Sequence, residues 1–236
     1  MTFDQASYDV RFEWGERGVT TLAPVSSVLV IVDVMSFSTC VTVAAGRGAT
    51  VYPYQWRDYS SVDFARSIGA ELAGPRGSTG YSLSPASLVG IPAGTRLVLP
   101  SPNGSSLTLL AAATAVWAGC LRNAQAVADA ATHVNGPIAV IGAGERWKED
   151  GSLRPAYEDL IGAGAIISHL PGRRSPEAQM AVDAFEAARP TLLTRLCECL
   201  SGRELIDRGF ESDVQIIADL DADSCVPVMS DGAYRT

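Results

Sequence analysis

The sequence lacks a hydrophobic run long enough to cross a bilayer, because the apolar stretch Val28–Val32 stops at Asp33. Residues 1–5 do not begin a basic segment followed by an apolar one, so no signal peptide is expected. Positive charge is also scarce, with 18 Lys and Arg against 26 Asp and Glu and a formal net charge of −8. This balance disfavours nucleic acids and anionic membranes as partners. We expect a cytoplasmic protein that binds a small anion only through a locally positive pocket or a bound cation.

Cysteine and histidine are too few and too scattered for a zinc site or a Cys–His catalytic pair. Cys197 and Cys199 are separated by one residue, which is one short of the usual metal or redox spacing, and both histidines are isolated. The odd number of cysteines, five, in a chain without an export signal favours reduced thiols.

The 236 residues, of which 47% are hydrophobic and 19% charged, fit a single globular domain spanning 1–236 with a substantial core. Apolar runs of strand length alternate with helical patterns, which predicts an α/β fold whose mostly parallel sheet is covered on both faces. The expected strands are 8–14, 28–32, 50–54, 71–73, 96–100, 115–118, 137–141 and 226–229. Residues 15–24 are expected to form a connection, and 107–116 and 191–201 to form helices.

The turn 101–106 is the most distinctive local feature. It follows an apolar run and precedes an alanine-rich one, and its Asn103-Gly104 pair suits a sharp backbone turn. Ser105 or Ser106 can cap the following helix. Backbone N–H groups, hydroxyls and a helix N-terminus gathered in this way favour a phosphate or sulfonate, although an ordinary hairpin or capped joint would have the same composition.

Three polar segments each follow a predicted strand: Asp33, the turn 101–106, and residues 142–145 with Glu145. In a parallel sheet the carboxyl ends of the strands meet at one edge, where ligands bind. We therefore expect these segments to share one crevice.

Several motifs resemble those of the 2-phosphosulfolactate phosphatase family, in the same order along the chain. Residues 30–39 resemble its opening Val-Ile-Asp-Val-Leu-Arg-Ala-Thr-Thr motif, and Pro102-Asn103-Gly104-Ser105 its Thr-Asn-Gly-Thr turn. Further matches are 82–85 to its Asn-Ser-Pro segment, 119–124 to Gly-x-x-x-Asn-Ala, 144–145 and 157–164 to Ala-Gly and Glu/Asp-Asp-x-x-Gly-Ala-Gly, and 226–227 to the family's ending.

The resemblance implies a three-layer α/β/α fold and Mg²⁺-dependent hydrolysis of the phosphate ester of a small sulfonated hydroxy acid. Ser36 stands where the family usually has Arg, and Pro75 where it has Glu, although Arg76 is retained. Because Ser cannot reproduce the bidentate grip of Arg on an anion, we keep the phosphatase class and leave the exact substrate open.

Mg²⁺ prefers hard oxygen ligands and needs only one or two carboxylates. Asp33, Glu158 and Asp159 are the candidate catalytic and metal-binding residues, with Glu145 as a fourth metal ligand. Asp33 could be a metal ligand or a nucleophile, or merely a helix N-cap, and Glu158 and Asp159 could merely be first-turn helix charges. The candidate phosphate- and substrate-binding residues are Ser38, Thr39, Arg76, Ser84, Ser101, Asn103, Gly104, Ser105, Arg122 and Asn123.

Three other classes of protein share parts of this pattern. Gly142-Ala143-Gly144 after a strand suggests a dinucleotide-binding oxidoreductase, but the third glycine of that motif is missing. A non-catalytic anion-binding protein on the same fold is the stronger alternative. A haloacid-dehalogenase phosphatase is disfavoured, because Asp33-Val34-Met35 lacks a second Asp. The sequence leaves the choice between monomer and homodimer open.

Overall fold

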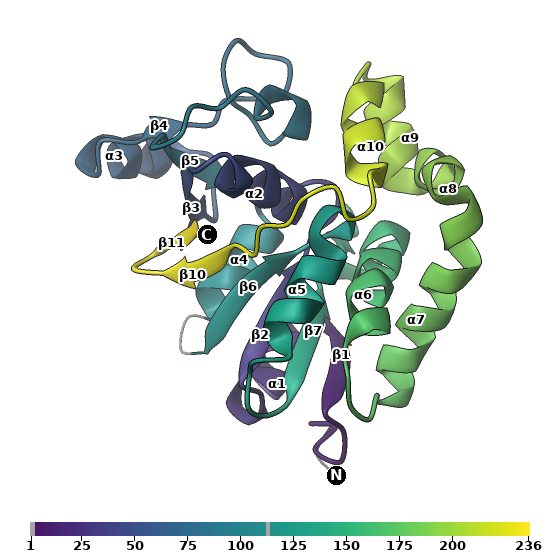
Figure 1. Ribbon diagram of the computed structural model, residues 1–236. Helices are drawn as coiled ribbons and strands as arrows, with labels where there is room; N and C mark the ends of the chain where they lie inside the picture. Colours follow the sequence, from purple (N-terminus) through teal and green to yellow (C-terminus); the bar gives the residue numbers. More distant parts are fainter. Residues whose placement is uncertain (1–2, 112–113) are drawn as a thin grey trace.

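The computed structural model describes residues 3–111 and 114–236, and within them one sheet contains nine strands (Figure 1). Residues 1–2 of the N-terminal segment and 112–113 of the expected helix 107–116 lie outside the described residues. The strand order is β1-β7-β2-β6-β10-β11-β3-β5-β4. The strands are β1 (Val10–Trp14), β2 (Val28–Val32), β3 (Thr50–Tyr54), β4 (Glu71–Leu72), β5 (Arg96–Pro100), β6 (Ala115–Gly119), β7 (Ile138–Gly142), β10 (Val228–Ser230) and β11 (Ala233–Arg235).

Helices cover both faces of this sheet, which confirms the mostly parallel three-layer α/β/α architecture (Figure 1). The apolar run of β2 is buried on both faces: Val30 packs in the core under α5, α6 and α7, and Ile31 in the core under α1, α2 and α4. The helices are α1 (Gly15–Leu22), α2 (Phe37–Gly46), α3 (Tyr59–Ser67), α4 (Gly104–Leu110), α5 (Ala124–Ala131), α6 (Tyr157–His169) and α7 (Pro176–Ala188), followed by α8 (Leu192–Glu198), α9 (Leu200–Asp207) and α10 (Glu211–Ala218).

The sheet consists of two parallel groups joined by an antiparallel hairpin. Strands β1, β7, β2 and β6 are parallel to one another, and so are β3, β5 and β4. Between the groups, β10 and β11 make three successive antiparallel pairings, which reverse the strand direction along the ladder. Gly104, just after β5, nevertheless donates a hydrogen bond to Asp33, just after β2. The hairpin is joined to each group through a single residue pair, Val228 with Trp117 and Tyr234 with Val51.

Helix α6 packs unusually closely on its neighbours because of its glycines. A Cβ at Gly164 would lie 2.0 Å from the Ala181 carbonyl oxygen of α7. The glycine costs helix propensity but lets the backbones of α6 and α7 approach. A Cβ at Gly162 would lie 2.5 Å from Val34 Cγ2, so this second glycine lets α6 approach the end of β2, where Asp159 of its first turn accepts the Val34 N–H.

Several local expectations were wrong. The segment expected as a connection, 15–24, contains α1, and the region 191–201 is divided between α8 and α9. The helix after the turn begins at Gly104 and ends at Leu110, while β6 begins at Ala115. The expected closing strand has an additional partner, β11, because the chain turns back at 231–232. In the part of the chain that the structure describes, no helix combines the length and apolar character needed to cross a membrane.

Candidate active site

Four carboxylates, which we call the carboxylate cluster, gather beside the end of β2: Asp33, Glu145, Glu158 and Asp159. Asp33 follows β2, Glu145 begins the short strand β8 (Glu145–Arg146) after β7, and the other two lie in the first turn of α6. β8 pairs with β9 (Leu153–Arg154) in a separate two-stranded sheet. Asp33, Glu158 and Asp159 are each at most 6% exposed. Of the segments expected to share one crevice, the turn 101–106 bonds both of the others, through Gly104 to Asp33 and through Asn103 to Glu145, while a crevice common to all three stays a prediction.

Asp33 is held by backbone groups on both sides. Its Oδ1 accepts from the Phe37 N–H at 3.1 Å, and its Oδ2 accepts from the Gly104 N–H at 2.8 Å. Ser101 donates its hydroxyl to the same Oδ2 at 3.5 Å, and Ser38 bridges the Asp33 backbone. The carboxylate therefore has a fixed position between α2 and α4.

Asp159 joins two loops of the site. Its Oδ1 accepts from the Val34 N–H and its Oδ2 from the Gly144 N–H, each at 2.8 Å. The glycine turn 142–144 thus donates its Gly144 N–H to Asp159, and Glu145 is the next residue in the chain. Glu145 accepts from Asn103 Nδ2 at 3.0 Å, which ties β8 to the turn before α4.

The turn 101–106 supplies its donors to the carboxylate cluster. The Gly104 N–H and the Ser101 hydroxyl bind Asp33, and Asn103 binds Glu145. Ser105 donates its hydroxyl to the Leu99 carbonyl, and α4 has only seven residues. The turn therefore positions catalytic candidates, whereas direct contact between this turn and a substrate phosphate stays a prediction.

A second feature, which we call the arginine cavity, lies next to the cluster and has a volume of about 310 Å³. Arg76 is its least exposed cation, since it pairs with buried Asp213 and donates to Ser36 Oγ at 3.0 Å. The lining residues are Met35, Arg57, Pro75, Arg76, Leu83, Glu145, Ser201, Glu204, Leu205 and Arg208. Glu145 thus belongs to the carboxylate cluster and also lines the arginine cavity.

Sequence reasoning missed Arg57, Arg208 and Asp213 in this region. Asp213, in the first turn of α10, is fully buried and also accepts from Ser84 Oγ at 2.6 Å and the Ala86 N–H at 3.1 Å. Ser84 therefore contacts Asp213, the partner of Arg76, and is linked to the arginine cavity through that carboxylate. The only sequence signal was that acidic first turn, which is common at helix N-termini and carries no information about a distant arginine.

Other candidates occupy structural positions. Arg122 pairs with Asp223 at 2.6 Å and Asp219 at 3.0 Å, and in the described residues it lines none of the cavities bordered by Glu145. The Asn123 side chain accepts from the Cys120 N–H and donates to the Cys225 carbonyl. Thr39 donates its hydroxyl to the Val34 carbonyl. All of these bonds hold loops around the sheet edge, and substrate contact by these residues stays a prediction.

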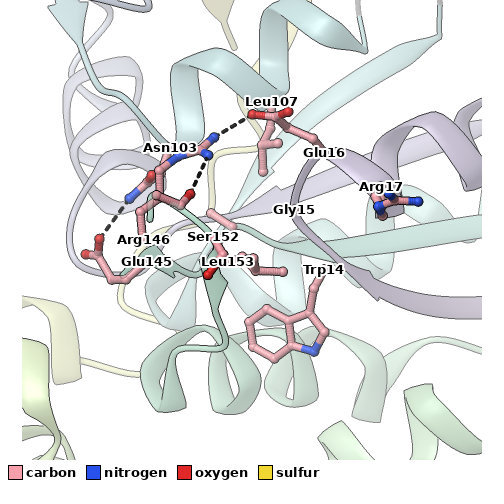
Figure 2. A pocket seen from close by; sticks show the side chains of 12 residues that line it. Trp14, Gly15, Glu16, Arg17, Asn103, Leu107, Glu145, Arg146, Ser152 and Leu153 are labelled. Carbon is pink, nitrogen blue, oxygen red and sulfur yellow. Dashed lines mark hydrogen bonds and ion pairs between the residues drawn. The ribbon is translucent and has the colours of Figure 1, made fainter. Parts of the chain in front are cut away.

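A second cavity, of about 230 Å³, is also lined by Glu145 and has a partly apolar wall (Figure 2). Figure 2 shows the Asn103 and Glu145 side chains meeting at one end of it, with the Trp14 indole set apart from them. Arg146 also lines this space, but its guanidinium is bonded to Glu16 and to the Gly151 carbonyl. We call this space the tryptophan cavity.

The donor set of the carboxylate cluster fits a hard divalent cation, since all of its side-chain ligands are carboxylate oxygens. Burial raises the pKa of Asp33 to about 6, and the charge of Glu158 adds to this while N–H donors oppose it. Burial and the charge of Asp33 raise the pKa of Glu145 to about 7. Burial, then the charges of Asp33 and Glu158, raises the pKa of Asp159 well above its ordinary value. Within the described residues, however, no three Asp, Glu, His or Cys side chains are grouped closely enough to hold one ion.

These raised pKa values predict that the metal-free protein loses stability as the pH rises. Carboxyls whose folded pKa exceeds the unfolded value contribute fully below pH 4, and that contribution is lost as the pH rises through about 6 for Asp33 and about 7 for Glu145. In chelator, we expect the free energy of unfolding to fall by ~2–4 kcal/mol between pH 5 and pH 8. Urea titrations would measure it. Glu145→Gln should flatten the profile, and a wild-type profile that rises with pH would contradict the assignment.

Comparisons with known proteins identify the family of this chain. The family model described as 2-phosphosulpholactate phosphatase matches residues 19–232. A probable 2-phosphosulfolactate phosphatase of Carboxydothermus hydrogenoformans is 32% identical over 211 residues, covering 84% of each chain. The 2-phosphosulfolactate phosphatase of Methanothermobacter thermautotrophicus is 29% identical over 210 residues, covering 88% of each. The matched region contains all four residues of the carboxylate cluster and the arginine cavity, and the protein belongs to the 2-phosphosulpholactate phosphatase family.

Proposed function

We propose that this protein is a phosphoric monoester hydrolase that cleaves the phosphate ester of a small acidic hydroxy acid, with 2-phosphosulfolactate as the first substrate to test. The observation that carries the proposal is the adjacency of the buried carboxylate cluster and the arginine cavity, which share Glu145. The names of the relatives from Carboxydothermus and Methanothermobacter support the same reaction.

Phosphoryl transfer requires a cation at the phosphoryl oxygens. It also requires an accurately held oxygen on the side of the phosphorus opposite the leaving oxygen. Arg76 meets the first need, because Asp213 and Ser36 hold its guanidinium in the wall of the cavity. Asp33 meets the second, because strand and helix backbone fix its carboxylate. As a nucleophile or as a metal ligand, Asp33 acts only in its anionic form. In hydrolysis, water supplies the oxygen that ends on phosphate, and the released hydroxy acid takes up a proton.

Mg²⁺ is the cofactor that we propose. Among the described residues, no three Asp, Glu, His or Cys side chains lie close enough together to hold one ion. Asp33 with either Glu158 or Glu145 would therefore hold the ion, and water would complete its coordination. When bound, the ion would neutralise charge on the phosphoryl oxygens. The mutual repulsion of the buried carboxylates supports this assignment, since a cation relieves it.

The proposal predicts a metal-dependent phosphatase. Phosphate release from 2-phosphosulfolactate should vanish in EDTA and return on addition of excess Mg²⁺ or Mn²⁺. Mg²⁺ should also raise the melting temperature of the chelated protein, because it binds the folded carboxylates and not the unfolded chain. Asp33→Asn should lose most of that thermal shift.

Full activity in chelator would refute the metal assignment and leave the phosphatase assignment in place. Binding of phosphate without turnover, under any metal condition and with any small acidic phosphate ester, would instead support the non-catalytic anion-binding alternative.

A further inference from the structure

We propose that Arg57 and Arg208 form, together with Arg76, a subsite for a second acidic group of the substrate. The enzyme then selects phosphate esters that carry a carboxylate or sulfonate beside the phosphate. This inference rests on the proposed function, and it assigns the substrate selectivity to residues outside the carboxylate cluster.

The three arginines come from three distant parts of the chain. Arg57 follows β3, Arg76 lies in the long loop 74–84, and Arg208 ends α9, yet all three line the arginine cavity. Among the described residues that line it, the carboxylates are Glu145 and Glu204. A volume of about 310 Å³ is at the lower end of the range for ligand pockets and suits a small molecule.

Arg76 forms the inner part of this cavity. Its side chain is only 11% exposed, and its partner Asp213 is 1% exposed. Its guanidinium also lies over the Phe210 ring, 5.4 Å from the ring centroid. These contacts hold Arg76 close to the loop after β2, where Ser36 accepts its bond at 3.0 Å. The inner position therefore suits the phosphate, which must approach Asp33.

Arg208 and Arg57 form the outer part. The Arg208 guanidinium lies 5.7 Å from the centroid of the same Phe210 ring, so two cations share one aromatic ring. Arg208 pairs with Glu204 at 3.2 Å, and because the Glu204 side chain is 65% exposed, this surface pair neutralises little charge. Arg57 is exposed and makes no ion pair within the described residues. An anion bound in the outer part of the cavity would be attracted by both Arg57 and Arg208.

The tryptophan cavity is a poorer place for the second anion. Its wall includes Trp14, Leu107 and Leu153, and Arg146 is already bonded to Glu16 and to a backbone carbonyl. The arginine cavity therefore offers the less committed positive charge.

The test compares two substrates that differ only in the second charge: the phosphate esters of lactate and of lactamide. We expect the wild-type enzyme to prefer the lactate ester in kcat/KM by about tenfold or more. Arg57→Gln and Arg208→Gln should each lower kcat/KM for the lactate ester by about tenfold and change that for the lactamide ester less than about threefold. Arg203→Gln is the matched control, because Arg203 is an exposed residue of α9 outside the lining of the arginine cavity.

Equal wild-type rates on the two esters would overturn the subsite, and so would variants that lose both activities equally or neither. If the wild type hydrolyses neither ester nor 2-phosphosulfolactate, the proposed function fails and binding alone decides the subsite. Calorimetry with sulfolactate and with lactamide then serves as the readout. Tighter binding of sulfolactate that is lost in R57Q and R208Q, but kept in R203Q, supports the subsite, whereas equal binding overturns it.

Discussion

Asp33→Asn should reduce turnover of 2-phosphosulfolactate by at least ~10³-fold, equivalent to ~4 kcal/mol of transition-state stabilisation. The amide has nearly the same shape, but it can neither attack phosphorus nor ligate a cation as a carboxylate does. A side chain at the end of a buried strand is held accurately, as an in-line reaction requires. Initial rates at saturating substrate and Mg²⁺ would measure the loss.

The same substitution should leave the fold nearly as stable as the wild type. Both carboxylate oxygens of Asp33 accept hydrogen bonds from backbone N–H groups. In Asn an amide nitrogen replaces one of these oxygens, so one N–H group loses its acceptor, at a cost of ~1 kcal/mol. Asn also removes the cost of burying a charge whose pKa is raised to about 6, which offsets that loss at neutral pH. If Asp33 only capped α2, activity would survive together with stability. A folded variant that works within a few-fold of wild type would remove Asp33 from the catalytic residues.

Gly104→Ala should lower turnover by ~10²-fold or more, because a single methyl group here would displace the carboxylate of Asp33, the proposed catalytic residue. A Cβ at this position would lie 2.7 Å from Asp33 Oδ2 and 2.3 Å from Phe37 Cδ1. Phe37 is fully buried and contacts the buried Tyr234 ring edge-on, so it has no free space to enter. Phosphate affinity should fall with turnover, and overpacking should cost ~1–3 kcal/mol in unfolding free energy.

Gly90→Ala is the control for this variant. A Cβ at Gly90 meets no atom within 4 Å, and its backbone is not in the left-handed region, so both activity and stability should stay close to wild type. If Gly104→Ala does not fold, adding Phe37→Leu creates room for the methyl group and should restore folding while the activity stays low. Wild-type turnover in either folded Gly104 variant would show that the position of Asp33 does not depend on this contact.

Local pattern was sufficient to predict much of the framework. The β-branched run of β2 indicated a strand buried on both faces, and the alternation of strands and helices indicated the layered α/β domain. Asp33 at a strand end and Asp159 in the first turn of a helix were found because their positions relative to an element follow from periodicity. The resemblance in motif order also indicated the family, which the comparisons confirm.

The sequence prediction that strand ends meet was correct for Asp33 and Gly104, but a single parallel ladder is not the reason. The hairpin of β10 and β11 separates two parallel groups, and its second strand was not expected from the sequence. Strand direction across a sheet depends on which edges pair, and that choice is made by contacts between residues more than a hundred positions apart.

The sequence by itself determined most strands of the sheet, the carboxylates that follow them and the family to which the chain belongs, because these depend on residues close together along the chain or on the order of motifs. Only the tertiary structure decided which partner each polar group meets. In the folded chain the donors of the turn 101–106 bind Asp33 and Glu145, and Arg76 pairs with Asp213, which is 137 residues away. It also brought Arg57 and Arg208 to one cavity. A guanidinium or an N–H group can bind any acceptor within reach, so its partner is chosen by how the helices pack on the sheet, and one-dimensional periodicity does not encode that packing.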